Sequence, residues 1–141
     1  MSYETTNPAG VQPLLQDGWI YVDIRTVEEF GPGHVPGAYN IPFLERSPMG
    51  QMVPNGEFLA AMQKHFPADA KLVIGCAAGG RSRHACDELA QAGFQSLVNM
   101  HGGFSGAFDM NGFCTEQGWQ ECGYECETDC QDGRDWDSLK S

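Results

Sequence analysis

The sequence predicts an α/β fold with a central parallel sheet of about five strands, flanked by helices on both faces. Short runs rich in apolar, β-branched and aromatic residues, such as 19–24 and 72–75, read as strands. They alternate with stretches whose apolar residues recur at helical spacing, such as 57–66 and 81–92. Strands that alternate with helices are joined by right-handed crossovers and form a parallel sheet covered on both faces. The 141 residues suffice for one such core.

The composition excludes several classes of protein. Hydrophobic residues make up 41% of the chain, which argues against disorder of the whole chain. No apolar run approaches the length that spans a bilayer, and residues 1–10 lack the basic start and apolar centre of a secretory signal. We therefore expect a cytoplasmic protein with no membrane partner. The net charge of −11 argues against a nucleic-acid partner, whose phosphates would be repelled.

The chain begins with elements that build one side of the predicted sheet. Residues 3–5 fit a short edge strand. Asn7 precedes a short helix, and Pro8 suits its first turn. The helix ends at 17–18, and the aromatic and β-branched run 19–24 then forms a central strand.

A short capped helix and a turn-rich passage follow this strand. Thr26 is predicted to cap the helix, and Glu29 completes a capping box with it. The passage 33–42 is rich in Gly and Pro and leads into a short strand. Asp23 and Arg25 stand at the end of the central strand, where a charge-assisted hydrogen bond between them would brace neighbouring loops.

The next elements complete the predicted fold. Residues 43–56 contain two prolines and two glycines and are expected to form a loop. Residues 57–66 form a helix whose Phe and Met side chains face the core, ended by Pro67. Residues 94–100 are the last strand, and 101–104 are a glycine-rich turn.

The segment 72–85 brings a strand, a tight loop and a helix start together around one thiol. The strand ends at Gly75, and Cys76 follows it directly. Backbone N–H groups of a tight loop converge on such a thiol at the positive end of the helix dipole, and these surroundings favour the thiolate form. Ligands of parallel sheets bind beyond the carboxyl ends of the strands, where Cys76 falls. The residues that form the loop and open the helix are Ala77, Ala78, Gly79, Gly80, Arg81 and Ser82.

This segment resembles the active-site loop of the rhodanese (sulfurtransferase) family. Four residues separate Cys76 from Arg81, the spacing of a loop that in this family fits a sulfur atom carried on the cysteine. Related phosphatases and some arsenate reductases carry a loop one residue longer, which holds a tetrahedral oxyanion. Residues 22–42 resemble the signature near the start of the rhodanese domain, and 101–104 resemble its closing turn. The resemblance covers residues 3–112, although the family often has Trp in a closing helix where this chain has Phe108.

The resemblance implies a sulfurtransferase that works by double displacement without a cofactor. The Cys76 thiolate would take sulfur from a donor such as thiosulfate or a persulfide, and the Cys76 persulfide would pass it to cyanide, a thiol or an acceptor protein. Backbone N–H groups from Ala77 to Ser82 would bind the transferred sulfur. Arg81 would hold an anionic donor or brace the loop, and both roles stay open. His34 is assigned a structural role in the brace formed by Asp23 and Arg25.

Two other functions are considered. The chain could be a rhodanese-like binding, regulatory or sulfur-relay module without efficient small-molecule turnover, although Cys76 and its loop are intact. It could also be a phosphatase or an arsenate reductase, against which the four-residue spacing argues. The acidic charge disfavours small anionic donors, so we consider a protein persulfide or thiol as the natural partner.

The last part of the chain differs in composition from the rest. Residues 112–141 hold eight acidic and two basic side chains, against eleven and six in residues 1–111. We therefore predict a rhodanese-like domain at 1–112 and an acidic, Cys-rich extension at 113–141. Four interpretations of the extension stay open: a metal site, disulfides, a sulfur relay or a poorly ordered segment. The spacing of the cysteines matches no common ligand pattern, so no metal is assigned. A cytoplasmic location disfavours disulfides. Its cysteines are Cys114, Cys122, Cys126 and Cys130.

Overall fold

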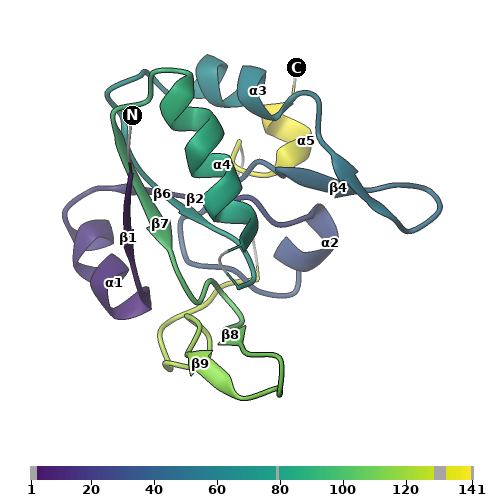
Figure 1. Cartoon of the computed structure of the whole chain (residues 1–141). Coiled ribbons are helices and arrows are strands. Elements are labelled where there is room, and N and C mark those ends of the chain that lie inside the picture. Colours follow the sequence, from purple (N-terminus) through teal and green to yellow (C-terminus); the bar gives the residue numbers. More distant parts are fainter. Residues whose placement is uncertain (1–2, 79, 129–132, 141) are drawn as a thin grey trace.

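A computed structural model of the chain describes residues 3–78, 80–128 and 133–140 (Figure 1). Among these residues, five strands form one sheet in which every neighbouring pair is parallel, in the order β1-β7-β6-β2-β3. The predicted α/β fold with a central parallel sheet is therefore confirmed. The strands of this sheet are β1 (Glu4–Thr6), β2 (Ile20–Asp23), β3 (Tyr39–Asn40), β6 (Lys71–Gly75) and β7 (Ser96–Met100).

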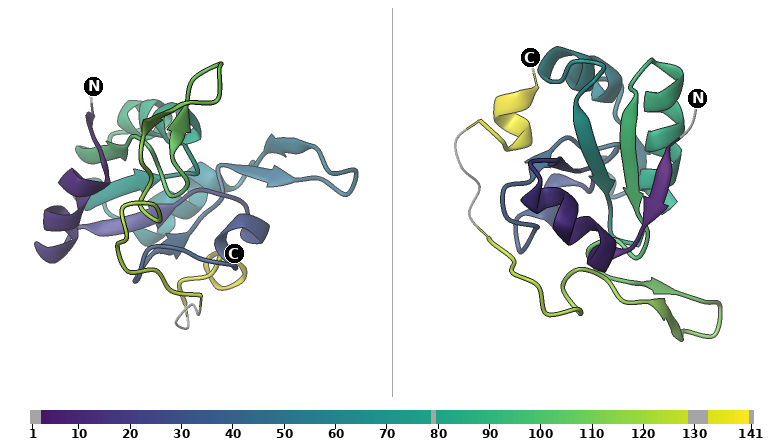
Figure 2. Two further views of the ribbon diagram at one scale, coloured as in Figure 1. Left: turned by 90° about the horizontal axis from the view of Figure 1, so that it is seen from below. Right: turned by 90° about the vertical axis from the view of Figure 1, so that its left-hand side faces the viewer.

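Helices cover both faces of this sheet, as Figure 2 shows for α1 and α4. One core cluster joins α3, α4 and α5 to side chains such as Leu72 and Ile74 of β6. The other joins α1 and α2 to Val73, because successive side chains of a strand point to opposite faces. The helices are α1 (Pro8–Gln16), α2 (Val27–Phe30), α3 (Phe58–His65), α4 (Gly80–Gln91) and α5 (Trp136–Leu139).

Side-chain caps are present at two helix starts, of which the sequence predicted the one at Thr26. The Asn7 side chain accepts a hydrogen bond from the N–H of Gly10 at 3.0 Å and caps α1. Thr26 caps α2, and its own N–H donates to the Glu29 carboxylate at 3.0 Å, so both halves of the capping box are formed. Each side chain thus satisfies backbone groups that the helix itself leaves without a partner.

The prediction of a loop at 43–56 is wrong, because the segment forms an antiparallel hairpin. Its strands are β4 (Leu44–Arg46) and β5 (Met52–Pro54), joined by a turn in which Gly50 has a φ of +84°. The hairpin accommodates both prolines because Pro48 lies in the turn and Pro54 at the end of a strand with only one neighbour.

A second antiparallel hairpin replaces the closing helix that the resemblance implied around Phe108. It is formed by β8 (Ala107–Phe108) and β9 (Cys114–Glu116), and the Phe108 side chain is exposed. Gly106 lies directly before it with a φ of +102°, a value that a helix does not accommodate.

The part of the extension that the structure describes is packed against the body of the protein. Trp119 joins the core cluster on the α1 face, and Trp136 and Leu139 join the cluster on the α3 face. The interpretation of the extension as poorly ordered is therefore wrong for these residues. The boundary predicted at residue 112 falls in the turn of the β8–β9 hairpin, and the division into two domains remains a prediction.

Candidate active site at Cys76

Cys76 lies directly after β6, a central strand, and its side chain is buried. The N–H of Ser82, in the first turn of α4, donates to the Cys76 sulfur at 3.4 Å. The Ser82 hydroxyl lies 3.5 Å from the same sulfur and donates a hydrogen bond to the Asn99 side chain of β7. The sulfur is thus held by the start of the helix that follows it, where the helix dipole favours negative charge.

The turn after β7 sets the orientation of the loop that follows Cys76. The carbonyl oxygens of Cys76 and Ala77 accept hydrogen bonds from the N–H groups of Phe104 and Ser105, both at 2.8 Å. The described peptide bonds are trans, so a carbonyl and the next N–H point in opposite directions. The N–H groups of Ala77 and Ala78 are therefore directed away from this turn.

Gly103 allows the turn to approach the loop so closely. Its φ is +56°, in the left-handed region. A Cβ atom at this position would collide with the carbonyl oxygens of Cys76 and Ala77. The sequence indicated a glycine-rich turn here, but not that the turn contacts the loop.

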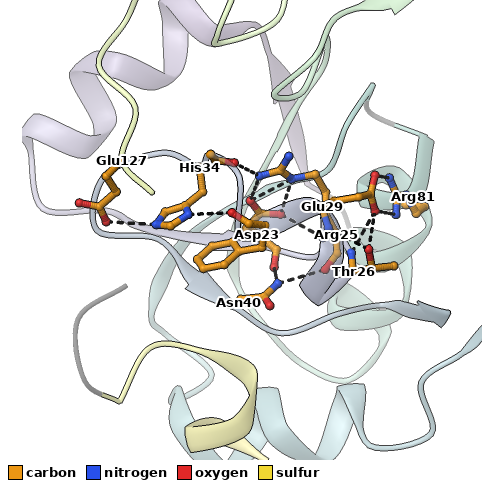
Figure 3. Close-up of polar contacts among 10 residues, drawn as sticks. Asp23, Arg25, Thr26, Glu29, His34, Asn40, Arg81 and Glu127 are labelled. Carbon is orange, nitrogen blue, oxygen red and sulfur yellow. Dashed lines mark hydrogen bonds and ion pairs between the residues drawn. The ribbon is translucent and has the colours of Figure 1, made fainter. Parts of the chain in front are cut away.

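Arg81 is held by Glu29, a residue that the sequence singled out only as part of the capping box. Its two terminal nitrogens lie 2.7 and 2.9 Å from the two Glu29 carboxylate oxygens (Figure 3). Partial burial raises the pKa of Glu29, but the hydrogen bonds from Arg81 and Thr26 outweigh this effect and lower the pKa to about 2. The pair ties the start of α4 to α2.

Asp23 and Arg25 form a second ion pair, which is buried at the carboxyl end of β2. Arg25 Nη2 lies 2.7 Å from Asp23 Oδ2 and also donates to the carbonyl oxygen of Gly33 at 2.8 Å. The guanidinium carbon stands 4.3 Å from the centre of the Phe104 ring. The pair therefore links β2 to two neighbouring turns (Figure 3).

His34 connects this region to the C-terminal extension. Its Nδ1 lies 2.9 Å from the carbonyl oxygen of Phe30, on whose ring it stacks, and its Nε2 lies 3.3 Å from Glu127 (Figure 3). The N–H of Gly37 donates to the same Glu127 carboxylate. No sequence pattern indicated Glu127, because the two partners are far apart in the chain.

A cleft of about 280 Å³ opens beside the loop. Phe104 and Ser105 line this cleft and donate hydrogen bonds to the carbonyl oxygens at the start of the loop. Glu29, which pairs with Arg81 at the other end of the loop, also lines it, so the cleft borders both ends of the loop. Gln120 extends the cleft from the C-terminal extension, and no sequence signal indicated it. The lining residues are Arg25, Glu29, Pro32, Gly33, Phe104, Ser105 and Gln120.

The remaining predicted site residues and cysteines are placed as follows. Gly80 begins α4, whereas Gly79 and Cys130 lie outside the described residues. Among the described cysteines, Cys86, Cys114, Cys122 and Cys126 are free thiols, and burial raises the pKa of Cys86 to about 12. Within the described ranges, no group of three or more His, Cys, Asp or Glu side chains is arranged to hold a metal ion.

The fold is shared with solved structures of low sequence identity. The crystal structure of Rv0390 from M. tuberculosis superposes with a TM-score of 0.75 at 23% identity, over 91% of this chain and 100% of that one. A solution structure of the rhodanese-like domain of the Anabaena protein Alr3790 gives a TM-score of 0.66 at 16% identity, over 94% of this chain and 83% of that one.

Two relatives from Arabidopsis thaliana are closer in sequence. "Thiosulfate sulfurtransferase 16, chloroplastic" is 38% identical over 121 residues, which cover 82% of this chain and 99% of the relative. "Protein HIGH ARSENIC CONTENT 1, mitochondrial" is 33% identical over 124 residues, which cover 88% of this chain and 72% of the relative. Both names give an organelle, so the cytoplasmic location remains a prediction.

Among the described residues, no helix has the length and apolar character of a membrane span.

The family model of the rhodanese-like domain matches residues 8–108, a stretch that holds the sheet strands β2, β3, β6 and β7 and the whole Cys76 loop. This chain is therefore a member of the rhodanese-like domain family.

Proposed function

We propose that the protein is a sulfurtransferase that carries sulfur as a persulfide on Cys76. The observation that supports this most directly is the geometry of the sulfur. Cys76 directly follows a central strand, and the first turn of α4 donates a backbone N–H to its sulfur at 3.4 Å. Such a donor stabilises a thiolate and, after transfer, a charged persulfide.

The first half of the proposed reaction loads Cys76. The thiolate attacks the outer sulfur of thiosulfate, or of a persulfide donor, and a new S–S bond forms. The S–S bond of the donor breaks, and sulfite, or the donor thiolate, leaves with the bonding electron pair. The N–H groups of Ala77 and Ala78, which point away from the 104–105 turn, are the further donors available to the charge on the transferred sulfur.

The second half returns Cys76 to its thiolate. Cyanide, a thiolate or an acceptor protein attacks the outer sulfur of the persulfide, and the S–S bond to Cys76 breaks. The sulfur leaves with the acceptor and no external oxidant or reductant is consumed. Arg81 keeps the loop in place through Glu29, and the Asp23–Arg25 pair braces the turns around it. We place this activity in the cytoplasm.

One relative supports a second candidate, reduction of arsenate at the same thiolate. Its name, "Protein HIGH ARSENIC CONTENT 1", refers to arsenic, and it is 33% identical to this chain. The four-residue spacing between Cys76 and Arg81 argues for sulfur, because a tetrahedral oxyanion needs a wider loop. Arsenate consumption by the reduced protein with a thiol reductant is the measurement that would favour this candidate.

The experiment that tests the main proposal is the intact mass of the protein after incubation with thiosulfate. We expect one added sulfur that disappears on addition of cyanide, with formation of thiocyanate. The Cys76→Ser variant should gain no sulfur, whereas Cys114→Ser, which changes an exposed thiol, should behave as the wild type. An unmodified wild type with thiosulfate and with a persulfide donor would contradict the proposal and favour a binding module.

A further inference from the structure

The β8–β9 hairpin projects from the edge of the sheet at which the strands end, beside the Cys76 loop (Figures 1 and 2). Its base is joined to the active site by backbone bonds. The N–H of Gly106 donates to the carbonyl oxygen of Gly102 at 2.7 Å, and the preceding Ser105 holds the carbonyl of Ala77. A partner that contacts the base of the hairpin therefore lies next to the loop that carries Cys76.

Large apolar side chains are exposed on this hairpin. The exposed fraction is 55% for Phe108, 104% for Met110 and 69% for Phe113. Single exposed apolar residues are common on protein surfaces, but three within six positions of one projecting hairpin are an unusual concentration. Concentrations of exposed apolar side chains mark interaction sites.

The tip that presents these side chains is held by hydrogen bonds. The Asp109 carboxylate accepts the N–H groups of Asn111 at 2.9 Å and Phe113 at 3.0 Å. The N–H of Asp109 donates to the carbonyl oxygen of Phe113 at 2.9 Å. A partner would therefore meet a preorganised tip, which lowers the entropy lost on binding.

The charge of the hairpin and its base selects the partner. Residues 107–121 hold three carboxylates and no Lys, Arg or His. A basic partner is attracted to such a surface, whereas a second copy of this chain, with a net charge of −11, and anionic membranes are repelled. The three carboxylates belong to Asp109, Glu116 and Glu121.

We propose that the β8–β9 hairpin is the docking surface for the protein that exchanges sulfur with Cys76, and that this partner presents a basic segment with apolar side chains. The exchange of sulfur rests on the function proposed above, whereas the docking does not. Ser105 and Gln120, which flank the hairpin in sequence, line the cleft beside the loop, so a docked partner reaches the cleft directly. A protein partner also fits the acidic charge, which disfavours small anionic donors.

Binding is tested with a synthetic peptide of alternating Lys and Leu that contains one Cys, labelled for fluorescence anisotropy. Replacement of Met110 and Phe113 by Ser should weaken binding about tenfold, because two anchors are lost. The matched control replaces Met49 and Met52 by Ser, exposed residues of the other hairpin, and should bind as the wild type. A peptide with Glu in place of Lys should not bind.

Transfer of sulfur from Cys76 is measured after loading with thiosulfate, on the wild type and on the hairpin variant in which Ser replaces Met110 and Phe113. We expect the hairpin variant to transfer sulfur to cyanide as the wild type does, but to the basic peptide about tenfold more slowly. Equal peptide binding by wild type and hairpin variant would overturn the docking proposal. Binding of neutral phosphatidylcholine vesicles that depends on the hairpin, without binding of the peptide, would also overturn it. Self-association that depends on the hairpin, without binding of the peptide, would do the same. A chain that takes up no sulfur but binds the peptide through the hairpin would refute the proposed function and leave the docking intact.

Discussion

At the scale of single residues, Glu29 has two roles, one in the cap of a helix and one beside the loop that carries Cys76. The same carboxylate completes the cap of α2 and holds both terminal nitrogens of Arg81. A charge-assisted pair with two parallel hydrogen bonds fixes direction as well as distance. We therefore propose that Arg81 supports the loop that carries Cys76.

Replacement of Glu29 by Gln tests this assignment. Gln cannot accept both hydrogen bonds from Arg81, so the loop should lose its fixed end and turnover with thiosulfate and cyanide should fall by about tenfold, or about 1.4 kcal/mol. The Glu28→Gln variant is the control, since it removes one charge from an exposed position of the same helix. Equal turnover of the two variants would contradict the role of Glu29.

The low pKa of Glu29 predicts how stability changes with pH. Its pKa is about 2 in the folded protein and 4.5 in the unfolded chain, so its carboxylate stabilises the fold above pH 4.5. That stabilisation is lost as the pH falls from 4.5 towards 2, because the proton then binds in both states. The difference in unfolding free energy between wild type and Glu29→Gln should therefore shrink on acidification, as measured by urea denaturation. A difference that does not change with pH would contradict this prediction.

At the scale of structural elements, the site depends on how the turn after β7 meets the loop after β6. Adjacent parallel strands end at the same edge, so β6 and β7 deliver their following segments side by side. The turn then donates its N–H groups to the carbonyls of the loop and sets the direction of the peptides next to Cys76. Gly103 is the residue on which this contact depends.

The Gly103→Ala variant tests the contact between turn and loop. The new Cβ would collide with backbone carbonyls, so we expect a loss of stability of about 1–3 kcal/mol and a severe loss of sulfur uptake by Cys76. Gly112→Ala is a matched control, since Gly112 also has a positive φ, +85°, but nothing lies within 4 Å of the new Cβ. It should lose about 1 kcal/mol from backbone strain alone and keep its activity. Denaturation and thiocyanate formation measure the two effects.

At the scale of the whole molecule, the C-terminal extension wraps the body and contributes to both core clusters. Trp119 packs on one face of the sheet, and Trp136 and Leu139 pack on the other. Between them, Glu127 pairs with His34, and the carbonyl oxygen of Arg134 accepts the N–H of Asn40 at 2.8 Å. The extension is thus held at several separate points of the fold.

Truncation of Trp136 measures the contribution of the extension to stability. The side chain is 3% exposed and lies in the cluster with α3 and α4, so Trp136→Ala should reduce the free energy of unfolding by about 3–5 kcal/mol. Met110→Ala, a fully exposed position, should change it by less than about 0.5 kcal/mol. A small effect of Trp136→Ala would show that the extension adds little to the folding of the body.

The amino-acid sequence by itself determined the features that depend on neighbours in the chain. Apolar periodicity predicted the parallel sheet, Pro8 and the capping residue Thr26 predicted the helix starts, and a strand followed by small residues placed Cys76 at a strand end. These follow from local propensity and from the two periodicities of backbone structure.

Only the tertiary structure decided the contacts between distant segments. The pairing of Arg81 with Glu29, the approach of Gly103 to the loop, and the packing of Trp136 join residues that no short pattern relates. Both hairpins were missed because two-stranded antiparallel ribbons of a few residues carry little periodicity, and their turn residues also suit a loop. The physical reason is the same throughout: the energy of these contacts exists only once the chain has closed on itself, so it leaves no trace in local sequence.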